Sequence, residues 1–333
     1  MIVLTGASGF LGAHILQNLL ASGYQVRAIK RANSDLSFVK RVVEKYGNAS
    51  DWNKIEWYEA DILDYFSLES AFEGATTVIH AAAMVSFWEK DRAQMYRVNV
   101  DGTANVVNAS LYCKVKEIVY ISSIAALGRS DLDEPISEKT PWKNSPDNSW
   151  YALSKNAGER EVWRGTEEGL PAIILNPGVI IGYAEWNKSS GKIFSQIKKG
   201  IPYYTSGANG FVDVKDVCNA LISLLKSEVR NERFVLVSET VPFKNMIEVI
   251  ASELKVNAPK KEISPLILKI AVKASAIWSK ISGKEPILSS ELAKTSQKQS
   301  QYLNTKIQET IHFKFTQVED SLRRTAQEFE AEF

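Results

Sequence analysis

The chain has 333 residues, enough to bury most of the surface that its unfolded form exposes, in one large domain or two unequal ones. Its 40 lysines and arginines balance 39 aspartates and glutamates, which leaves no basic surplus to bind nucleic acid and no acidic surplus to favour disorder. Two distant cysteines, Cys113 and Cys218, argue against a disulfide framework or a zinc site.

Targeting and membrane-spanning segments are not expected. The first predicted strand begins at Met1, which leaves no room for a signal peptide, and no run of 18 or more apolar residues occurs. We therefore expect a cytoplasmic protein.

The first dozen residues predict a strand, a glycine-spaced turn and the start of a helix. Residues 2–4 form the short apolar run of a strand that is buried on both faces. Gly6 permits a tight turn, Gly9 lets the backbone approach a pyrophosphate, and Gly12 lets the helix lie close to the strand. Amides and the dipole at the helix start would bind phosphates, and a second strand over 24–29 completes the unit.

The end of this second strand indicates which dinucleotide binds. An acidic residue there would bind a ribose 2′-hydroxyl, whereas arginine suits a 2′-phosphate. The sequence has Lys30 and Arg31, with no carboxylate before Asp35, so we expect NADP rather than NAD. Alternatively, the two cations are ordinary solvated charges at a strand end.

Strands and helices alternate further along the chain. The pattern predicts an α/β fold, a Rossmann-type doubly wound parallel sheet. Its further strands are expected at 55–58, 77–79, 117–121, 173–175 and 233–237, with helices at 35–46 and 91–112 and one ending at Leu225.

A serine, a tyrosine and a lysine carry the expected chemistry. Ser123 follows the strand at 117–121, at the sheet edge where doubly wound folds place ligands. Tyr151 and Lys155 are four residues apart on a predicted helix and so share one face. Lowering a tyrosine pKa from about 10 to about 7 requires roughly 4 kcal/mol, which a nearby desolvated ammonium can supply in part.

The order of these motifs resembles the extended branch of the short-chain dehydrogenase/reductase superfamily, also called the NAD-dependent epimerase/dehydratase family. The resemblance is carried by Thr5-Gly6-Ala7-Ser8-Gly9-Phe10-Leu11-Gly12, Asp61-Ile62, His80-Ala81-Ala82-Ala83, Asn99-Val100-Asp101-Gly102-Thr103, Ser122-Ser123, Tyr151-Ala152-Leu153-Ser154-Lys155 and Phe211-Val212-Asp213-Val214-Lys215-Asp216-Val217. It implies a buried structural Asn99, and His80 is more simply a structural histidine than a base.

The resemblance also implies the site residues. Ser123, Tyr151 and Lys155 would be catalytic, Tyr151 as proton donor or acceptor and Lys155 also as a ligand of the nicotinamide ribose. No metal site is expected. The expected cofactor-binding residues are Thr5, Gly6, Ser8, Gly9, Phe10, Leu11, Gly12, Lys30, Arg31, Asp61, Ile62, Ala81, Ala82, Ala83, Ser122, Tyr151, Lys155, Asn176, Pro177 and Gly178.

Two departures from the sugar-modifying members favour a reductase. Asn176 stands where nucleotide-sugar epimerases have an arginine, and Ile124 and Ala125 stand where sugar dehydratases tend to have acidic residues. The chain is more similar to the dihydroflavonol reductase and 3β-hydroxysteroid dehydrogenase groups. The resemblance therefore implies an NAD(P)-dependent oxidoreductase that reduces a carbonyl or oxidises a secondary alcohol. A nucleotide-sugar epimerase and a non-catalytic dinucleotide sensor are the alternatives.

The family arrangement implies two parts. Residues 1–182 and 209–240 would form the dinucleotide-binding domain, and residues 183–208 and 241–333 a smaller substrate-binding cap. Aromatic residues in and near the cap would suit an apolar or ring-bearing substrate, or could be ordinary core. They are Tyr183, Trp186, Phe194, Tyr203 and Tyr204.

An amphipathic helix with three lysines is predicted over 265–282, and a second amphipathic helix ends the chain around Val318, Leu322 and Phe329. The helix at 265–282 would more often cover a pocket or a neighbouring subunit in a homodimer, and peripheral membrane contact is the less favoured alternative. We also expect the protein to bind a small-molecule substrate.

Overall fold

The computed structural model describes residues 1–129, 134–286 and 288–332. Its main element is a seven-stranded sheet in the order β3-β2-β1-β4-β5-β6-β9, in which every pair of neighbours is parallel. The strands are β1 Ile2–Thr5, β2 Val26–Lys30, β3 Glu56–Glu59, β4 Thr77–His80, β5 Glu117–Ile121, β6 Ala172–Pro177 and β9 Glu232–Leu236. The predicted Rossmann-type sheet is confirmed.

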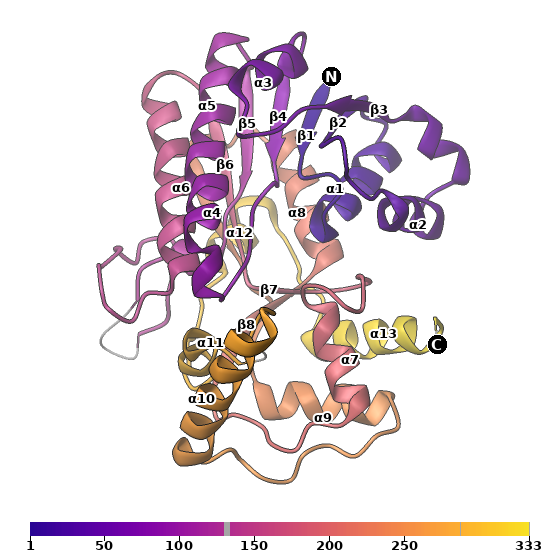
Figure 1. Cartoon of the computed structure of the whole chain (residues 1–333). Helices are drawn as coiled ribbons and strands as arrows, with labels where there is room; N and C mark the ends of the chain where they lie inside the picture. The colour runs from indigo at the N-terminus through magenta and orange to yellow at the C-terminus, as the bar shows by residue number, and fades with distance from the viewer. Residues whose placement is uncertain (130–133, 287, 333) are drawn as a thin grey trace.

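Alternate residues of each strand face different helix layers. Ile2 and Leu4 pack into one buried cluster with α1 Phe10–Ala21, α2 Ser37–Tyr46 and α8 Val214–Lys226. Val3 packs into a second cluster, on the opposite face, with α3 Tyr65–Phe72, α5 Gly102–Tyr112 and α6 Trp150–Glu167. Figure 1 shows these layers, with α5 and α6 on one side of the sheet and α1 and α8 on the other. Both sheet faces are therefore covered, which explains the continuous apolar runs of its strands.

The helical segment before α5 contains one wide turn. The predicted helix over 91–112 is formed by α4 Arg92–Tyr96, a π-helical turn at Arg97–Asp101 and α5. Gly158 of α6 packs directly against this turn. A Cβ atom on residue 158 would lie 2.3 Å from the backbone oxygen of Asn99, so a side chain would not fit there. The π turn and the glycine together bring α6 close to Asn99.

A second, smaller sheet lies beyond the carboxyl end of β6. It joins β7 Val179–Ile181, β8 Ala208–Asp213 and β10 Glu239–Pro242 in the order β10-β8-β7. Asp213 caps α8 by accepting a hydrogen bond from the Lys215 amide at 2.8 Å. Asp216, in the first turn of α8, accepts hydrogen bonds from the backbone amide and the hydroxyl of Thr316.

The remaining helices gather at the end of the molecule toward which the strands of the main sheet run (Figure 1). They are α7 Gly191–Lys199, α9 Phe243–Glu253, α10 Pro265–Ser282, α11 Ser290–Thr295 and α13 Val318–Glu330, while α12 Thr305–Ile311 contacts β9. Of the aromatic residues proposed above for the substrate, Tyr183, Trp186 and Phe194 are buried in the core. Within the described ranges, no helix has both the length and the apolar character to cross a bilayer.

Candidate active site

The turns after β1 and β4 lie against each other at the point where the strand order reverses. A Cβ atom on Gly6, which has φ +74°, would lie 2.5 Å from the Ala82 amide nitrogen. A Cβ atom on Gly12 would lie 2.0 Å from the Gly6 carbonyl oxygen. The tight turn and the close helix packing that the glycine spacing predicted are therefore confirmed.

The start of α1 fits a phosphate group. Its N-cap residue is the exposed Gly9, which has no side chain to accept hydrogen bonds from the first amides of the helix. Gly9 donates to the Gly6 carbonyl at 3.0 Å, and the Ala13 amide donates to the Gly9 carbonyl at 2.9 Å. The amides of residues 10–12 between them remain available at the positive end of the helix dipole. The pyrophosphate of a dinucleotide would be held there.

The two cations expected at the adenosine end differ in their surroundings. Lys30 lies 3.5 Å from a carboxylate oxygen of Glu59 on the neighbouring strand. Arg31 is exposed, and its backbone amide donates to the Ser34 hydroxyl at 3.0 Å. Arg31 is therefore the freer of the two to meet a 2′-phosphate.

Asp61 and Ile62 follow β3 in a tight turn. The Asp61 carboxylate accepts a hydrogen bond from the Leu63 amide at 2.9 Å, and the Ile62 carbonyl accepts one from the Asn105 side chain at 3.0 Å. These bonds fix the turn in front of α3, so the predicted adenine contact of Asp61 would be made by a carboxylate that is already oriented.

Ser123 and Tyr151 meet at the carboxyl end of β5. The Ser123 hydroxyl lies close enough to the Tyr151 phenol to interact with it, and the Ser123 oxygen accepts a hydrogen bond from the Ala125 amide at 3.1 Å. Burial raises the pKa of Tyr151 above its ordinary value, and the interaction with Ser123 opposes that shift. The phenol therefore keeps its proton at neutral pH in the absence of other ligands.

Lys155 lies one turn further along α6 and is fully buried. Its Nζ donates to the Tyr120 hydroxyl at 3.0 Å and to the Ile121 carbonyl at 2.8 Å. Burial lowers the pKa of Lys155 to about 7, and the nearby Glu159 carboxylate acts in the opposite direction. Lys155 is thus held against β5, two residues before Ser123, and changes its charge near neutral pH.

A chain of buried hydroxyl and imidazole groups runs behind these residues. His80 contacts the Thr5 hydroxyl through Nδ1 at 2.7 Å and the Thr103 hydroxyl through Nε2 at 3.0 Å. Burial and the Lys155 charge lower the pKa of His80 to about 3, so the ring is neutral. Thr103 in turn donates to the Asn99 carbonyl at 2.8 Å and interacts with the Tyr120 hydroxyl. His80 therefore has a structural role, as we expected.

Asn99 is the buried, fully bonded side chain that the motif implied. Its Oδ1 accepts from the Met84 amide at 2.7 Å, and its Nδ2 donates to the Met84 carbonyl at 2.9 Å and to Ser154 at 3.0 Å. Asn99 thereby connects the segment after Ala83 to the helix that carries Tyr151.

Two residues expected to face the cofactor are instead bonded within the protein. The Ser122 hydroxyl donates to a carboxylate oxygen of Glu159 at 2.6 Å, and Asn176 Nδ2 donates to the same oxygen at 2.8 Å. Asn176 also donates to the Ser123 carbonyl at 3.0 Å, while its Oδ1 has no partner among the described residues. The cofactor contacts predicted for Ser122 and Asn176 stay predictions, and both side chains are already bonded to the carboxylate of Glu159.

A comparison with known families decides the chain's membership. The sequence profile of the NAD dependent epimerase/dehydratase family matches residues 2–236. The chain belongs to this family. It is accordingly an enzyme of the extended short-chain dehydrogenase/reductase superfamily with an NAD(P) cofactor, as the motifs indicated.

Individual members of the superfamily are similar over most of the chain. Cinnamoyl-CoA reductase 1 of Petunia hybrida is 28% identical over 266 residues, 75% of this chain and 76% of the relative. Dihydroflavonol 4-reductase of Dianthus caryophyllus is 25% identical over 274 residues, 78% of this chain and 75% of the relative. The crystal structure of gox2253 is 26% identical and superposes with a TM-score of 0.82, covering 100% of this chain and 98% of that one.

Three charged residues of this family member were not identified from the sequence. Glu159 lies four residues after Lys155 and pairs with Arg233 of β9 at 2.9 Å. Glu291 of α11 lies beside the start of α6, and burial raises the pKa of its carboxyl group. The helical spacing could have pointed to Glu159, whereas Arg233 and Glu291 approach from distant parts of the chain.

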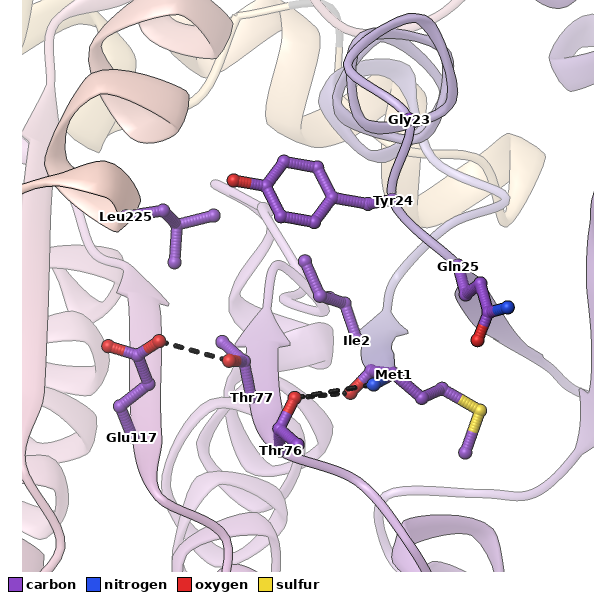
Figure 2. A pocket seen from close by; sticks show the side chains of 9 residues that line it. All are labelled: Met1, Ile2, Gly23, Tyr24, Gln25, Thr76, Thr77, Glu117 and Leu225. Carbon is purple, nitrogen blue, oxygen red and sulfur yellow. Dashed lines mark hydrogen bonds between the residues drawn. The ribbon is translucent and has the colours of Figure 1, made fainter.

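A small pocket of about 230 Å³ lies at the opposite edge of the sheet. Figure 2 shows it among Met1, Tyr24, Thr77 and Glu117, where Thr77 donates to Glu117 at 3.0 Å. These residues precede or begin their strands, and ligands of doubly wound sheets bind at the carboxyl ends. This pocket is therefore not the active site.

Proposed function

We propose that this enzyme is an NADP-dependent oxidoreductase that reduces the carbonyl of an apolar, ring-bearing substrate, or oxidises the corresponding secondary alcohol. The observation that carries the proposal is the placement of Ser123 beside the Tyr151 phenol, with Lys155 one turn away on the helix that carries Tyr151. A dinucleotide-binding turn at the same sheet edge completes the arrangement.

The roles of the three residues follow from their protonation. The bound nicotinamide supplies or accepts the hydride. Tyr151, whose pKa is raised by burial, carries the proton that the carbonyl oxygen needs as it becomes an alcohol. Ser123 holds the same oxygen by a hydrogen bond. In the oxidative direction Tyr151 must lose its proton first, and the positive charge of Lys155 favours the phenolate.

Aromatic and apolar groups beside Tyr151 support the substrate class. The ring of Phe87 lies edge-on to Tyr151, with 6.2 Å between centroids, and the neighbouring Val85 and Trp150 are partly open to solvent. Position 176 holds a neutral asparagine, which is buried and bonded to Glu159. This position therefore offers no cation for a sugar diphosphate. The similar cinnamoyl-CoA reductase and dihydroflavonol 4-reductase agree with ring-bearing carbonyl substrates.

A screen of NADPH oxidation tests the proposal. The purified enzyme would be offered aromatic aldehydes, flavanone-like ketones, ketosteroids and sugar nucleotides, with absorbance at the nicotinamide band as the readout. We expect NADPH consumption with one of the apolar carbonyl classes. Interconversion of sugar nucleotides without net NADPH consumption would show an epimerase, and dinucleotide binding without turnover of any class would support a sensor.

A further inference from the structure

Helix α10 presents its large apolar side chains to solvent. The exposed fraction is 83% for Ile281, 69% for Leu266, 60% for Ile277 and 59% for Ile270, and these four positions fall on one helix face. The other members of this face are Ile267 and Trp278. An amphipathic helix in a globular protein normally turns such a face toward the core.

The opposite face of α10 attaches the helix to the rest of the protein. Leu268, Ser275 and Ser279 are its buried residues, and the Ser275 hydroxyl accepts a hydrogen bond from the Leu288 amide at 2.9 Å. Ser279 donates to the Lys284 carbonyl at 2.6 Å. In Figure 1, α10 lies at the end of the molecule away from the main sheet, next to α11. The orientation of its apolar face is therefore fixed by contacts and is not an effect of a loose segment.

Lysines lie along one border of this apolar face, with little compensating negative charge. Residues 260–284 contain six lysines and one glutamate, in a chain whose net charge is only +1. Helix α10 itself has no acidic residue, and its lysines lie next to the apolar face when plotted at 100° per residue. Those three lysines, Lys269, Lys273 and Lys280, are exposed.

We propose that α10 is a membrane-surface helix, which lays its apolar face into the headgroup boundary of an anionic bilayer. A row of large apolar side chains with flanking lysines and a tryptophan is the composition of helices that lie in a membrane interface. Lysines near such a surface are attracted by anionic lipids, roughly 5-fold in affinity for each one. A second copy of this chain is the weaker candidate occupant, because a two-fold contact would place six lysines of one copy against the same six of its partner.

The inference is tested on the full-length protein by co-sedimentation with two kinds of vesicle. One is pure phosphatidylcholine, and the other contains about one-third phosphatidylglycerol. We expect binding to the anionic vesicles, much weaker binding to the neutral ones, and loss of binding as salt is added. Replacing both Ile277 and Ile281 by serine should lower the partition coefficient at least ~10-fold. Replacing Lys269, Lys273 and Lys280 by glutamine should lower it ~100-fold.

Matched control variants test whether a loss of vesicle binding is specific to α10, or follows from removing any exposed apolar side chain or positive charge. Phe66→Ser and Tyr112→Ser remove exposed aromatic residues from α3 and α5, and Lys116, Lys226 and Lys314 changed to glutamine alter the net charge equally. These controls should bind like the unchanged protein, and circular dichroism should show that every variant is folded. Failure of the unchanged protein to bind anionic vesicles would overturn the proposal. Equal vesicle binding by the α10 variants and the unchanged protein would also overturn it. So would a dimer of the unchanged protein, detected by ultracentrifugation, that the α10 variants abolish while no protein binds vesicles.

Discussion

Lys155 and Glu159 lie one turn apart on α6, and both are almost completely removed from solvent, at 1% and 2% exposure. The carboxylate is held by Ser122, Asn176 and Arg233, and it raises the pKa of Lys155 against the larger lowering effect of burial. Glu159 is therefore a positioning residue that sets the charge of Lys155 near the pH at which the enzyme would work.

The first prediction concerns this pair. In Glu159→Gln the single amide oxygen can still accept from Arg233, and the NH2 group that replaces the other oxygen can donate to the Ser122 hydroxyl, but the negative charge is lost. The pKa of Lys155 should then fall below its value of about 7, and the alkaline decline of the reduction rate should move to lower pH. The measurement is a pH profile of kcat/KM, with Glu161→Gln, on an outer position of the same helix, as the control. An unchanged alkaline limb would show that Glu159 does not act on Lys155.

A second prediction concerns stability. The pKa of Lys155 is about 7 in the folded protein and near 10.5 when unfolded, so above pH 7 the unfolded state binds the extra proton. Folding stability contributed by this group should therefore rise with pH, by up to ~1.4 kcal/mol per pH unit between 7 and 10.5.

Urea unfolding at pH 7.5 and 8.5 measures that effect. Relative to Lys155→Met, which has no charge to bury, the unchanged protein should gain about 1 kcal/mol over this interval. Burial raises the pKa of Cys113 and Cys218 in the folded protein, and because both variants carry these thiols, their contribution cancels in the comparison. If the free energy of unfolding changes equally with pH in the two proteins, the pKa of Lys155 is not lowered in the folded state.

Cofactor choice gives a third prediction. Arg31 is exposed at the end of β2, whereas Lys30 lies near Glu59, so Arg31 should supply most of the preference for a 2′-phosphate. Arg31→Asp should invert the ratio of NADPH to NADH affinity, and Lys30→Ala should change it much less. Fluorescence titration of both cofactors measures the ratio. If Arg31→Asp leaves it unchanged, Arg31 is an ordinary surface charge.

Much of the fold could be predicted from local patterns. The seven parallel strands follow from short apolar runs between helical segments, and α10 begins and ends at the predicted Pro265 and Ser282. The turn after β1 was predictable from the glycine spacing, because a side chain at Gly6 or Gly12 would collide with the neighbouring backbone. The order of the strands then determined which loops meet at the carboxyl edge.

Long-range contacts explain what could not be predicted. The small sheet of β7, β8 and β10 pairs short segments that are far apart in the sequence, so no local pattern indicates it. The hydroxyl of Ser122 is bonded to Glu159 because α6 packs against β6 and the 3-10 turn after β5, a contact that the strand sequence alone does not show. Likewise, Glu291 reaches the start of α6 from 140 residues further along the chain.

In the proposed mechanism the Tyr151 phenol carries the proton of the reaction. A comparison of the Tyr151→Phe variant with the unchanged enzyme, on whichever carbonyl substrate the NADPH screen identifies, tests this role. Phenylalanine keeps the ring beside Phe87 but removes the hydroxyl that interacts with Ser123. We predict that kcat falls by at least ~100-fold while the affinity for NADPH stays nearly the same. Comparable turnover by the variant would contradict the mechanism.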